Sequence, residues 1–363
     1  MTQTAIPFHF MRGGTSRGPY LNRADLPADQ DKLAEVLIAM VGSGHPLNID
    51  GIGGGAAVTT KVAMLSPSED DWADVDYFFA QVSVETKLVD FKPTCGNILV
   101  GVGPAAIEMG LVAPTGDVTA VKIRAVNTGA KVLARVQTPG GQVSYEGDAA
   151  IDGVPGTSAP IELNFMEVVG GATGQLFPTG NRIDEIDGIK VSCMDVAMPM
   201  VIARAADFGL TGYETAQELD DNAGFYARME PLRRKAGELM GMGDVSESVT
   251  PKFGLLAPAR DGGAATVRYF MPWNCHPSLA VTGSQCLSAC LLCPGTIAEG
   301  ILNPRPSAPA TLHLEHPMGK LEVVVDYSLQ DLAFNVISAG LVRTARKLAV
   351  GEVFVPRAVW DGA

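Results

Sequence analysis

The sequence lacks the patterns of a membrane protein or an exported protein. No stretch approaches the roughly 20 consecutive apolar residues that a membrane-spanning helix needs. Residues 1–10 have neither the basic start nor the long apolar segment of a secretory signal peptide. We therefore expect a cytoplasmic protein that has no membrane partner.

Positive charge is also scarce. The 27 lysines and arginines stand against 40 acidic residues, which gives a formal net charge of −13 at pH 7. A protein that follows nucleic-acid phosphates needs a basic surface, so we expect no nucleic-acid partner. A small anionic polycarboxylate is still a possible ligand, because a pocket can be locally positive on an acidic protein.

Several familiar functional motifs are missing. The glycine-rich segment 12–18 has neither the Walker A pattern nor the G-x-G-x-x-G fingerprint, and no H-E-x-x-H zinc motif occurs. The six cysteines include a formal C-x-x-C at Cys290 and Cys293, but its neighbours are typical of a buried helix, where free cysteine packs like a small hydrophobe. We expect reduced thiols, no metal site and no cofactor.

The chain is rich in hydrophobic residues (47%), with 41 glycines and 24 prolines that imply many tight turns. Its 363 residues are long for one core and favour two domains. Apolar periodicity predicts helices over 31–41, 96–110 (bent by Pro104), 224–241 and 282–293. Strands are expected at 74–84, 118–126, 130–137, 142–146, 189–204, 252–257, 264–271, 311–315 and 320–326. So many strands with few helices between them argue against a doubly wound parallel sheet.

Lys61 and Cys95 are the candidate catalytic residues. Lys61 precedes an apolar run that reads as a strand, so its amine should be partly desolvated and usable as a base. Cys95 stands where a loop becomes a helix, and thiols at helix N-termini ionise more readily. An amine and a thiol of this kind can move a proton on and off carbon, which favours an isomerase. The alternatives are a surface lysine and a structural cysteine.

Other residues are suited to binding carboxylates. The segment 12–18 combines Arg12 and Arg17 with the hydroxyls of Thr15 and Ser16 and with glycines that a ligand can approach closely. Arg268 is a candidate for binding a second carboxylate of the ligand. His276 is a candidate hydrogen-bond donor or proton carrier. Solvated loop arginines, an internal ion pair and a structural histidine are the alternatives.

Two passages repeat one local pattern, a turn of small residues that enters an apolar helix. One is Cys95-Gly96-Asn97 and the other is Thr282-Gly283-Ser284. Helix N-termini offer unpaired N–H groups to anions. A duplicated fold with a site between its halves follows, in which Gly96, Asn97, Thr282, Gly283 and Ser284 are substrate-binding candidates.

Long motifs across nearly the whole chain carry a family resemblance. They lie at 11–18, 49–54, 60–63, 74–77, 95–99, 151–157, 243–245, 267–270, His276 and 343–347. Together they resemble the PrpF-like family of methylaconitate isomerases, and within it the group of 4-oxalomesaconate tautomerases and Δ-isomerases.

The resemblance implies an α+β, diaminopimelate-epimerase-like fold with two similar domains. Each domain would be a mostly antiparallel, barrel-like sheet around a central helix. The first would comprise 1–187 plus a C-terminal strand at about 343–357 and carry Lys61 and Cys95; the second, 188–342, would carry Thr282. Since Thr282 takes the place of the second cysteine of the epimerases, a two-thiol racemase is disfavoured. The oligomeric state is left open, a homodimer included.

The resemblance also implies a function. It is that of a cofactor-independent proton-transfer isomerase of an unsaturated tricarboxylate, with 4-oxalomesaconate of gallate, protocatechuate or lignin-derived aromatic catabolism as first candidate. The alternatives are a 2-methylaconitate or methylitaconate isomerase and, more distantly, a non-catalytic accessory binding protein. Allylic isomerisation and keto–enol tautomerisation stay open, as does which of Lys61 and Cys95 is the base.

Overall fold

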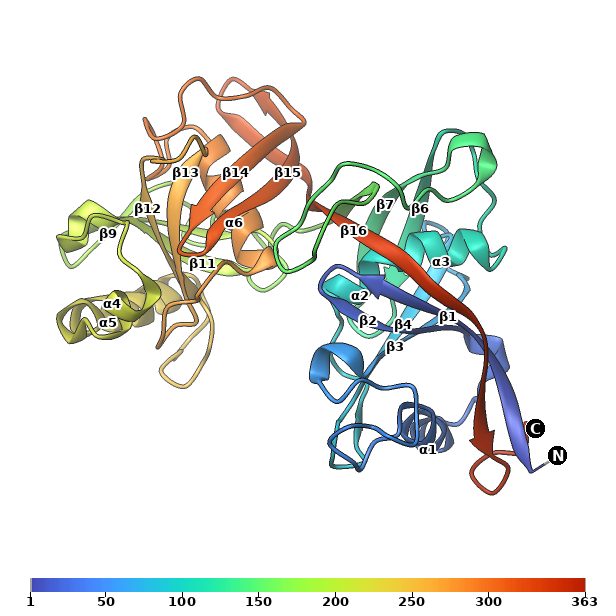
Figure 1. Cartoon of the computed structure of the whole chain (residues 1–363). Helices are drawn as coiled ribbons and strands as arrows, with labels where there is room; N and C mark the ends of the chain where they lie inside the picture. Colours follow the sequence, from blue (N-terminus) through green and yellow to red (C-terminus); the bar gives the residue numbers. More distant parts are fainter. Residues whose placement is uncertain (1, 363) are drawn as a thin grey trace. The chain divides into compact units, whose positions relative to one another are not determined.

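The computed structural model of the chain describes residues 2–362 and divides into two compact units. One unit contains the chain up to Phe165 together with the segment from Val342 onward, and the other is Met166–Leu341. Both units consist of a mixed sheet with few helices (Figure 1), so the α+β class expected from the sequence is confirmed. No helix within the described residues is both long and apolar enough to cross a membrane.

The segment 166–187 lies in the second unit, whereas we expected it in the first domain. Asp195 holds part of it, because its Oδ2 accepts the N–H groups of Ala172 at 2.9 Å and Thr173 at 2.8 Å. Strand β9 (Asp184–Ile186) also pairs with β10 (Ile189–Asp195). These backbone contacts, which composition does not reveal, move the boundary to Met166.

The first unit is built on a sheet that closes on itself. Its strands are β1 (Gln3–Gly13), β2 (Ser16–Asn22), β3 (Lys61–Pro67), β4 (Val75–Val82), β5 (Val89–Asp90), β6 (Val118–Ala125), β7 (Ala130–Gln137), β8 (Pro160–Met166) and the later part of β16 (Ala333–Pro356). The order is β1-β2-β3-β4-β6-β7-β8-β16, and β16 also pairs with β1, which completes the ring. The β2–β3 and β4–β6 pairs are parallel, and the β1–β2, β3–β4, β6–β7 and β7–β8 pairs are antiparallel.

Alternation along the strands gives this sheet two apolar faces. On β3, Ala63 and Leu65 belong to the core around the helices α2 (Gly96–Val100) and α3 (Val102–Glu108). Val62 and Met64 belong instead to the core around α1 (Gln30–Val41). We call these the α2 face and the α1 face.

Local sequence explains the helices of the first unit. The α1 helix begins after Asp29, whose side chain accepts the Lys32 N–H at 2.8 Å, and it ends at Gly42 with a φ of +78°. The helix expected over 96–110 is divided into α2 and α3 at Gly101. Pro104 can neither donate a hydrogen bond to the carbonyl four residues earlier nor avoid crowding it, which accounts for the interruption.

Two strand predictions were wrong in detail. Residues 142–146 are not a strand, because the chain leaves the sheet after the short 3₁₀ helix η3 (Pro139–Gly141), where two glycines have positive φ. The single strand expected over 189–204 is two strands, β10 and β11 (Pro199–Arg204), which pair antiparallel. Between them Ala197 has a φ of +58°, a turn conformation that the apolar sequence does not announce.

The second unit repeats the style of the first. Its further strands are β12 (Lys252–Ala257), β13 (Ala265–Phe270), β14 (Ala310–His316), β15 (Gly319–Gln330) and the first part of β16, and its helices are α4 (Ala216–Asp220), α5 (Ala223–Leu239) and α6 (Val281–Leu292). The remaining 3₁₀ helices of the chain are η1 (Arg23–Asp25), η2 (Ala57–Thr59) and η4 (Ala205–Phe208). The almost fully buried α6 packs on β10, β11, β14 and β15, so a central helix is again covered by the sheet.

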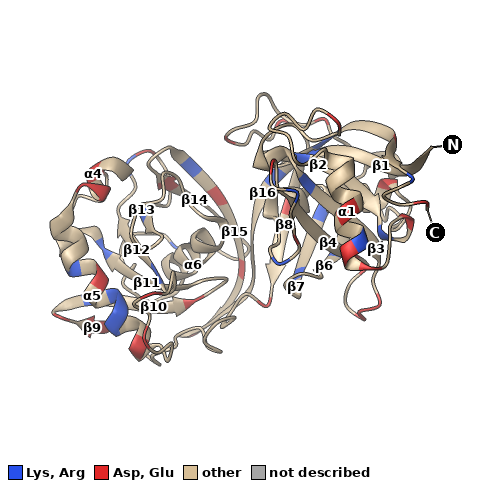
Figure 2. Cartoon of the chain, turned by 90° about the horizontal axis from the view of Figure 1, so that it is seen from below, with Lys and Arg blue, Asp and Glu red and all other residues tan. Residues whose placement is uncertain are grey.

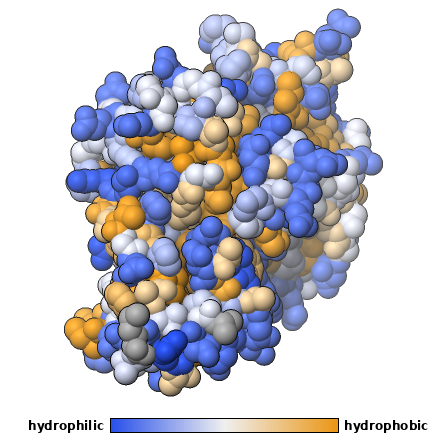
Figure 3. All heavy atoms as spheres, turned by 90° about the vertical axis from the view of Figure 1, so that its right-hand side faces the viewer, coloured by the Kyte–Doolittle hydropathy of each residue, from blue (hydrophilic) through white to orange (hydrophobic). Residues whose placement is uncertain are grey.

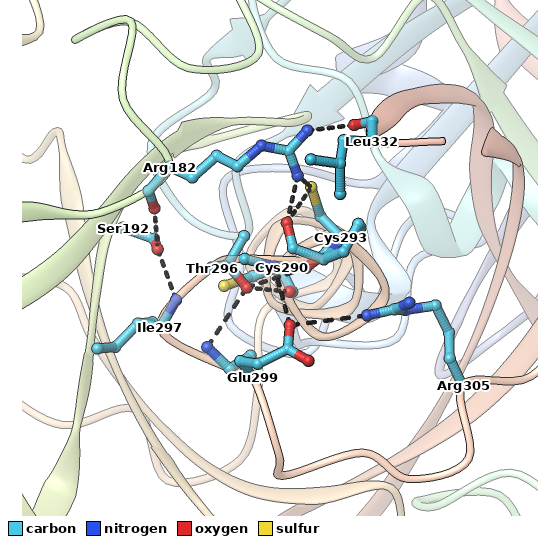
Figure 4. A network of polar contacts seen from close by, with 12 residues as sticks. Arg182, Ser192, Cys290, Cys293, Thr296, Ile297, Glu299, Arg305 and Leu332 are labelled. Atoms are coloured by element: carbon cyan, nitrogen blue, oxygen red, sulfur yellow. Dashed lines mark hydrogen bonds and ion pairs between the residues drawn. The ribbon is translucent and has the colours of Figure 1, made fainter. Parts of the chain in front are cut away.

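The C-x-x-C cysteines lie at the end of α6 in a hydrogen-bonded network (Figure 4). Thr296 Oγ1 donates to the carbonyl of Cys290 at 2.7 Å, and Arg182 donates to the Cys293 sulfur at 3.0 Å. Burial raises the pKa of Cys290 to about 12 and that of Cys293 to about 11. All six cysteines are free thiols, and no group of three or more His, Cys, Asp or Glu side chains among residues 2–362 is placed to hold a metal ion.

Some large apolar side chains of the first unit remain exposed. They are Leu47, Ile49, Leu88, Val350 and Phe354, among others. Figure 3, which draws one side of the molecule, shows apolar areas separated by polar ones. Scattered exposed apolar residues are normal on folded proteins, so we assign them no partner.

Candidate functional site

The β1–β2 turn and the start of α2 are in direct contact. Asn97 Nδ2 donates to Thr15 Oγ1 at 3.0 Å, and the Thr15 N–H donates to Asn97 Oδ1 at 3.4 Å. A Cβ atom on Gly14 would lie 2.2 Å from Asn97 Oδ1, and one on Gly13 would lie 2.3 Å from the Asn97 carbonyl oxygen. The two glycines are therefore required for this approach, which joins two of the segments singled out in the sequence.

Lys61 is the first residue of β3 and shares the α2 face with Ala63 and Leu65. Its Nζ donates to Gln81 Oε1 at 2.5 Å and lies 5.4 Å from the centroid of the Phe79 ring, a cation–π distance. The adjoining β2 strand approaches closely, since a Cβ on Gly18 would lie 1.8 Å from the Lys61 carbonyl oxygen. The half-buried amine is thus held at a defined place on the α2 face.

Cys95 occupies the N-cap position of α2, and its side chain makes no capping hydrogen bond. The half-buried thiol packs against the core cluster that contains Tyr77 and Phe79, and Tyr77 OH donates to the Cys95 carbonyl at 3.3 Å. Since Phe79 also contacts the Lys61 amine, the Tyr77–Phe79 pair, with ring centroids 6.3 Å apart, lies against both the Lys61 amine and the backbone of Cys95.

Two buried tyrosines hold the start of α2. Burial, followed by the nearby Cys95, raises the pKa of both Tyr20 and Tyr77 well above the ordinary value, so their hydroxyls stay protonated. Tyr20 OH donates to the Ile98 carbonyl at 2.6 Å. Sequence reasoning missed Tyr20, Tyr77 and Gln81, because only the fold brings them to these partners.

Ser16 lies on the α2 face as well, since it alternates with Arg17 on β2 in the same phase as Gly18 and the core residue Tyr20. Its Oγ is buried and has no hydrogen-bond partner within the described residues. An unpaired buried hydroxyl costs roughly 1–3 kcal/mol, so a ligand that pairs with it would recover that energy. Residues 14–18 also spell G-x-S-x-G, but they connect two strands of a hairpin rather than a strand and a helix, so they form no nucleophile elbow.

Arg12 and Arg17 lie on the α1 face, away from Lys61. They are opposite each other in the β1–β2 pair and alternate with residues that face α2. Arg12 Nη1 donates hydrogen bonds to the carbonyls of Gly14 at 3.0 Å and Thr344 at 2.8 Å. The structure therefore brings Thr15, Ser16 and Asn97 to the start of α2, whereas both guanidinium groups lie on the other face of the sheet, where Arg12 and Arg17 line a cavity together with Thr15 and Ser16.

The candidate residues of the second unit have their own surroundings. Arg268 is 5% exposed, and its Nε and Nη1 donate to the backbone carbonyls of Glu214 at 2.6 Å and Val267 at 2.8 Å. A ligand role for Arg268 stays a prediction. His276 Nδ1 accepts the Ser278 N–H at 3.0 Å, and burial lowers the His276 pKa. The ring is therefore neutral at pH 7 and carries its proton on Nε2.

The start of α6 differs from the start of α2. Its N-cap is Ala280, so Thr282 lies inside the helix rather than at the cap that Cys95 occupies in α2. Ser284 Oγ donates to the Val281 carbonyl at 2.7 Å, and a Cβ on Gly283 would lie 2.2 Å from the Tyr269 ring. Gly283 is thus required for packing, and a ligand role for these three residues stays a prediction.

Sequence reasoning overlooked Gln285 and Ser288 on α6. Both side chains are buried, and neither finds a hydrogen-bond partner among residues 2–362. Two polar residues one helical turn apart in an otherwise apolar helix were the available signal.

Comparison with known proteins gives consistent results. A profile of the family described as PrpF protein matches residues 3–356. The chain is 49% identical over 351 residues to a (4E)-oxalomesaconate Delta-isomerase of Novosphingobium, covering 97% of this chain and 98% of that one. It is 44% identical over 362 residues to a 4-oxalomesaconate tautomerase of Pseudomonas putida, covering 100% and 99%. A crystal structure of methylitaconate-delta-isomerase matches with a TM-score of 0.90 and 34% identity, covering 99% and 97%.

Proposed function

Because the chain belongs to the PrpF protein family and is an isomerase, we propose that it transfers a proton between carbons of an unsaturated tricarboxylate. The first candidate substrate is 4-oxalomesaconate, which the names of two relatives contain. A methylitaconate or 2-methylaconitate isomerase is the second candidate, favoured by the names of other relatives. The reaction as proposed consists of proton transfers alone.

One observation carries the proposal. The Lys61 amine, the Cys95 thiol and the unpaired Ser16 hydroxyl all belong to the α2 face, around Tyr77, Phe79 and the start of α2. An amine and a thiol on the same face of one sheet, beside one core cluster, are suited to act on two positions of one bound molecule.

The proposed reaction has two steps. One group removes a proton from a carbon made acidic by an adjacent carbonyl or vinylogous carboxylate, which leaves a dienolate. The other group returns a proton at a different position, and this shifts the double bond or interconverts keto and enol forms. The N–H groups of Gly96 and Asn97 and the Ser16 hydroxyl are the donors that would stabilise the dienolate oxygen.

Gln81 has a positioning role in this proposal. Its Oε1 accepts one Lys61 proton, while its Nε2 donates to the Thr60 hydroxyl and the Val82 carbonyl, each at 3.2 Å. Because these bonds fix the orientation of the amide, they also fix the direction of the Lys61 amine. The contact makes Lys61 a positioned group rather than a freely rotating surface lysine.

The test is direct. The ultraviolet absorbance of 4-oxalomesaconate is followed with purified enzyme in deuterated water, and the product is identified by NMR. We expect turnover and deuterium at the newly protonated carbon. Turnover of methylitaconate or 2-methylaconitate instead would move the proposal to the second candidate, and tight binding of all three acids without turnover would favour an accessory binding protein.

We also propose that the enzyme acts in the cytoplasm as a homodimer on its small polycarboxylate substrate. The isomerase and tautomerase names of the relatives support the substrate class. Sedimentation equilibrium at micromolar concentration measures the mass, and a value of one chain would contradict the dimer.

A further inference from the structure

Three arginines stand side by side across three neighbouring strands of the first unit. Arg12 is directly opposite Arg17 in the β1–β2 pair and directly opposite Arg346 in the β1–β16 pair. Residues directly opposite each other in antiparallel strands point to the same face, and neighbouring strands lie about 4.8 Å apart. Figure 2 shows basic residues on β2 and β16. The pairing of the three strands therefore places the three arginines in one row.

This row lies on the α1 face, whereas Lys61 and Cys95 belong to the α2 face. On β16, Ala345 belongs to the core around α2, so its neighbour Arg346 points the other way. All three arginines line a cavity of about 330 Å³, together with hydroxyl-bearing residues that include Thr15, Ser16, Thr157 and Ser158. Thr15 and Ser16 of the β1–β2 turn therefore adjoin both this cavity and the region at the start of α2. Neither Lys61 nor Cys95 is among the described residues that line it.

The charge of this cavity is uncompensated. None of its described lining residues is acidic, and within residues 2–362 neither Arg17 nor Arg346 forms an ion pair with a carboxylate. Burial, followed by the nearby Arg346, lowers the pKa of Arg12. Like charges directly opposite in a sheet destabilise it. On a chain of net charge −13, such a concentration of guanidinium groups is suited to an anionic ligand.

We propose that this cavity is a second ligand site that binds a small polycarboxylate; it shares Thr15 and Ser16 of the β1–β2 turn with the α2-face site but is lined by neither Lys61 nor Cys95. Guanidinium groups bind carboxylates through two parallel hydrogen bonds, and the hydroxyls add further donors. A row that extends over three strands suits several carboxylates spread along a carbon chain. A single phosphate gathers its oxygens around one atom and reaches fewer of the three groups. The proposal holds whatever reaction the α2 face performs.

Isothermal titration of the full chain with propane-1,2,3-tricarboxylate, a saturated and unreactive tricarboxylate, tests the proposal. We expect two bound equivalents in the wild type, and in Arg346→Gln one of the two to bind at least tenfold more weakly. The matched control Arg135→Gln removes an exposed strand arginine of the same unit and should retain both. Lys61→Ala should keep the site that Arg346→Gln weakens. A single equivalent in the wild type, or two unchanged equivalents in Arg346→Gln, would overturn the proposal.

Thermal unfolding separates a ligand-binding arginine from a structural one. Without ligand, Arg346→Gln should unfold at the wild-type temperature or above it, because a like-charge contact is relieved. With the tricarboxylate, its upward shift should be smaller than that of the wild type. A clearly lower unfolding temperature without ligand would assign Arg346 a structural role and overturn the proposal. Equal binding of inorganic phosphate in place of the tricarboxylate would overturn the class of ligand.

Discussion

Asn97 and Thr15 hold each other by hydrogen bonds in both directions, from Asn97 Nδ2 to Thr15 Oγ1 at 3.0 Å and from the Thr15 N–H to Asn97 Oδ1 at 3.4 Å. This contact fixes the β1–β2 turn against the first turn of α2. We expect Asn97→Ala and Thr15→Val each to destabilise the protein and to show a coupling energy of about 0.5–1.5 kcal/mol in a double-mutant cycle. Urea unfolding of the four proteins measures it, and additive effects would contradict the contact.

Lys61→Ala and Cys95→Ala should each lower kcat by about 10²–10⁴, the usual contribution of general acid–base catalysis, while the protein stays folded. Lys32→Ala, which removes a lysine that is ion-paired on the surface of α1, is the control and should leave kcat unchanged. Steady-state kinetics measures kcat of each variant, and circular dichroism shows whether the variant is folded. Full activity in either variant removes that residue from the mechanism.

Gln81→Ala should lower kcat about tenfold while changing KM little, because it releases the Lys61 amine without removing it. Steady-state kinetics and thermal unfolding of the variant distinguish this positioning role from a merely structural one, since loss of positioning lowers kcat at an unchanged unfolding temperature. An unchanged kcat with a lower unfolding temperature would show that Gln81 only stabilises the fold.

Gly18→Ala should destabilise the protein by about 1–3 kcal/mol, the usual cost of overpacking. Its Cβ would lie 1.8 Å from the Lys61 carbonyl oxygen, so β2 or β3 must move. Gly116→Ala is the matched control, since its Cβ would have no neighbour within 4 Å. Denaturant unfolding should show a large effect at position 18 and almost none at 116; equal effects would contradict the close approach of β2 and β3.

Glu315 should make stability depend on pH in the acid range. Burial alone would raise its pKa, but hydrogen bonds from Arg260 N, Asp261 N, Gly263 N and Thr266 Oγ1 lower the pKa to about 2. A lowered carboxyl pKa stabilises the fold above the unfolded-state value and loses this effect as the pH falls, here between about 4.5 and 2. We expect the free energy of unfolding of Glu315→Gln, measured with urea, to be roughly 3 kcal/mol below that of the wild type at pH 7. Near pH 2 the difference should be much smaller. A difference from wild type that is independent of pH would refute this account.

The helices were largely predictable from sequence because their signals are local. The apolar spacing and Asp29 cap of α1 and the largely apolar second half of α6 are each contained in one stretch of chain, and both helices begin within a residue of the expected place. The failed strand at 142–146 shows the opposite case. Whether a short polar segment joins a sheet depends on which edge is available, and the positive φ of Gly140 and Gly141 directs the chain away.

The sequence by itself determined the family and, through that resemblance, the α+β class, and it singled out Lys61, Cys95 and the 12–18 segment as candidates, since these rest on residue type and short motifs. Only the tertiary structure decided which side chains share a face. At β16 the register shifts opposite Phe10 and Met11, so Ala349 and Lys347 are paired but Leu348 is not. This extra residue reverses the alternation: Val353 and Val355 lie on the α1 face, yet Arg346 rather than Ala345 lies there after the bulge. A pairing between chain ends more than 300 residues apart therefore placed three arginines together and kept them apart from Lys61, and no local pattern encodes it.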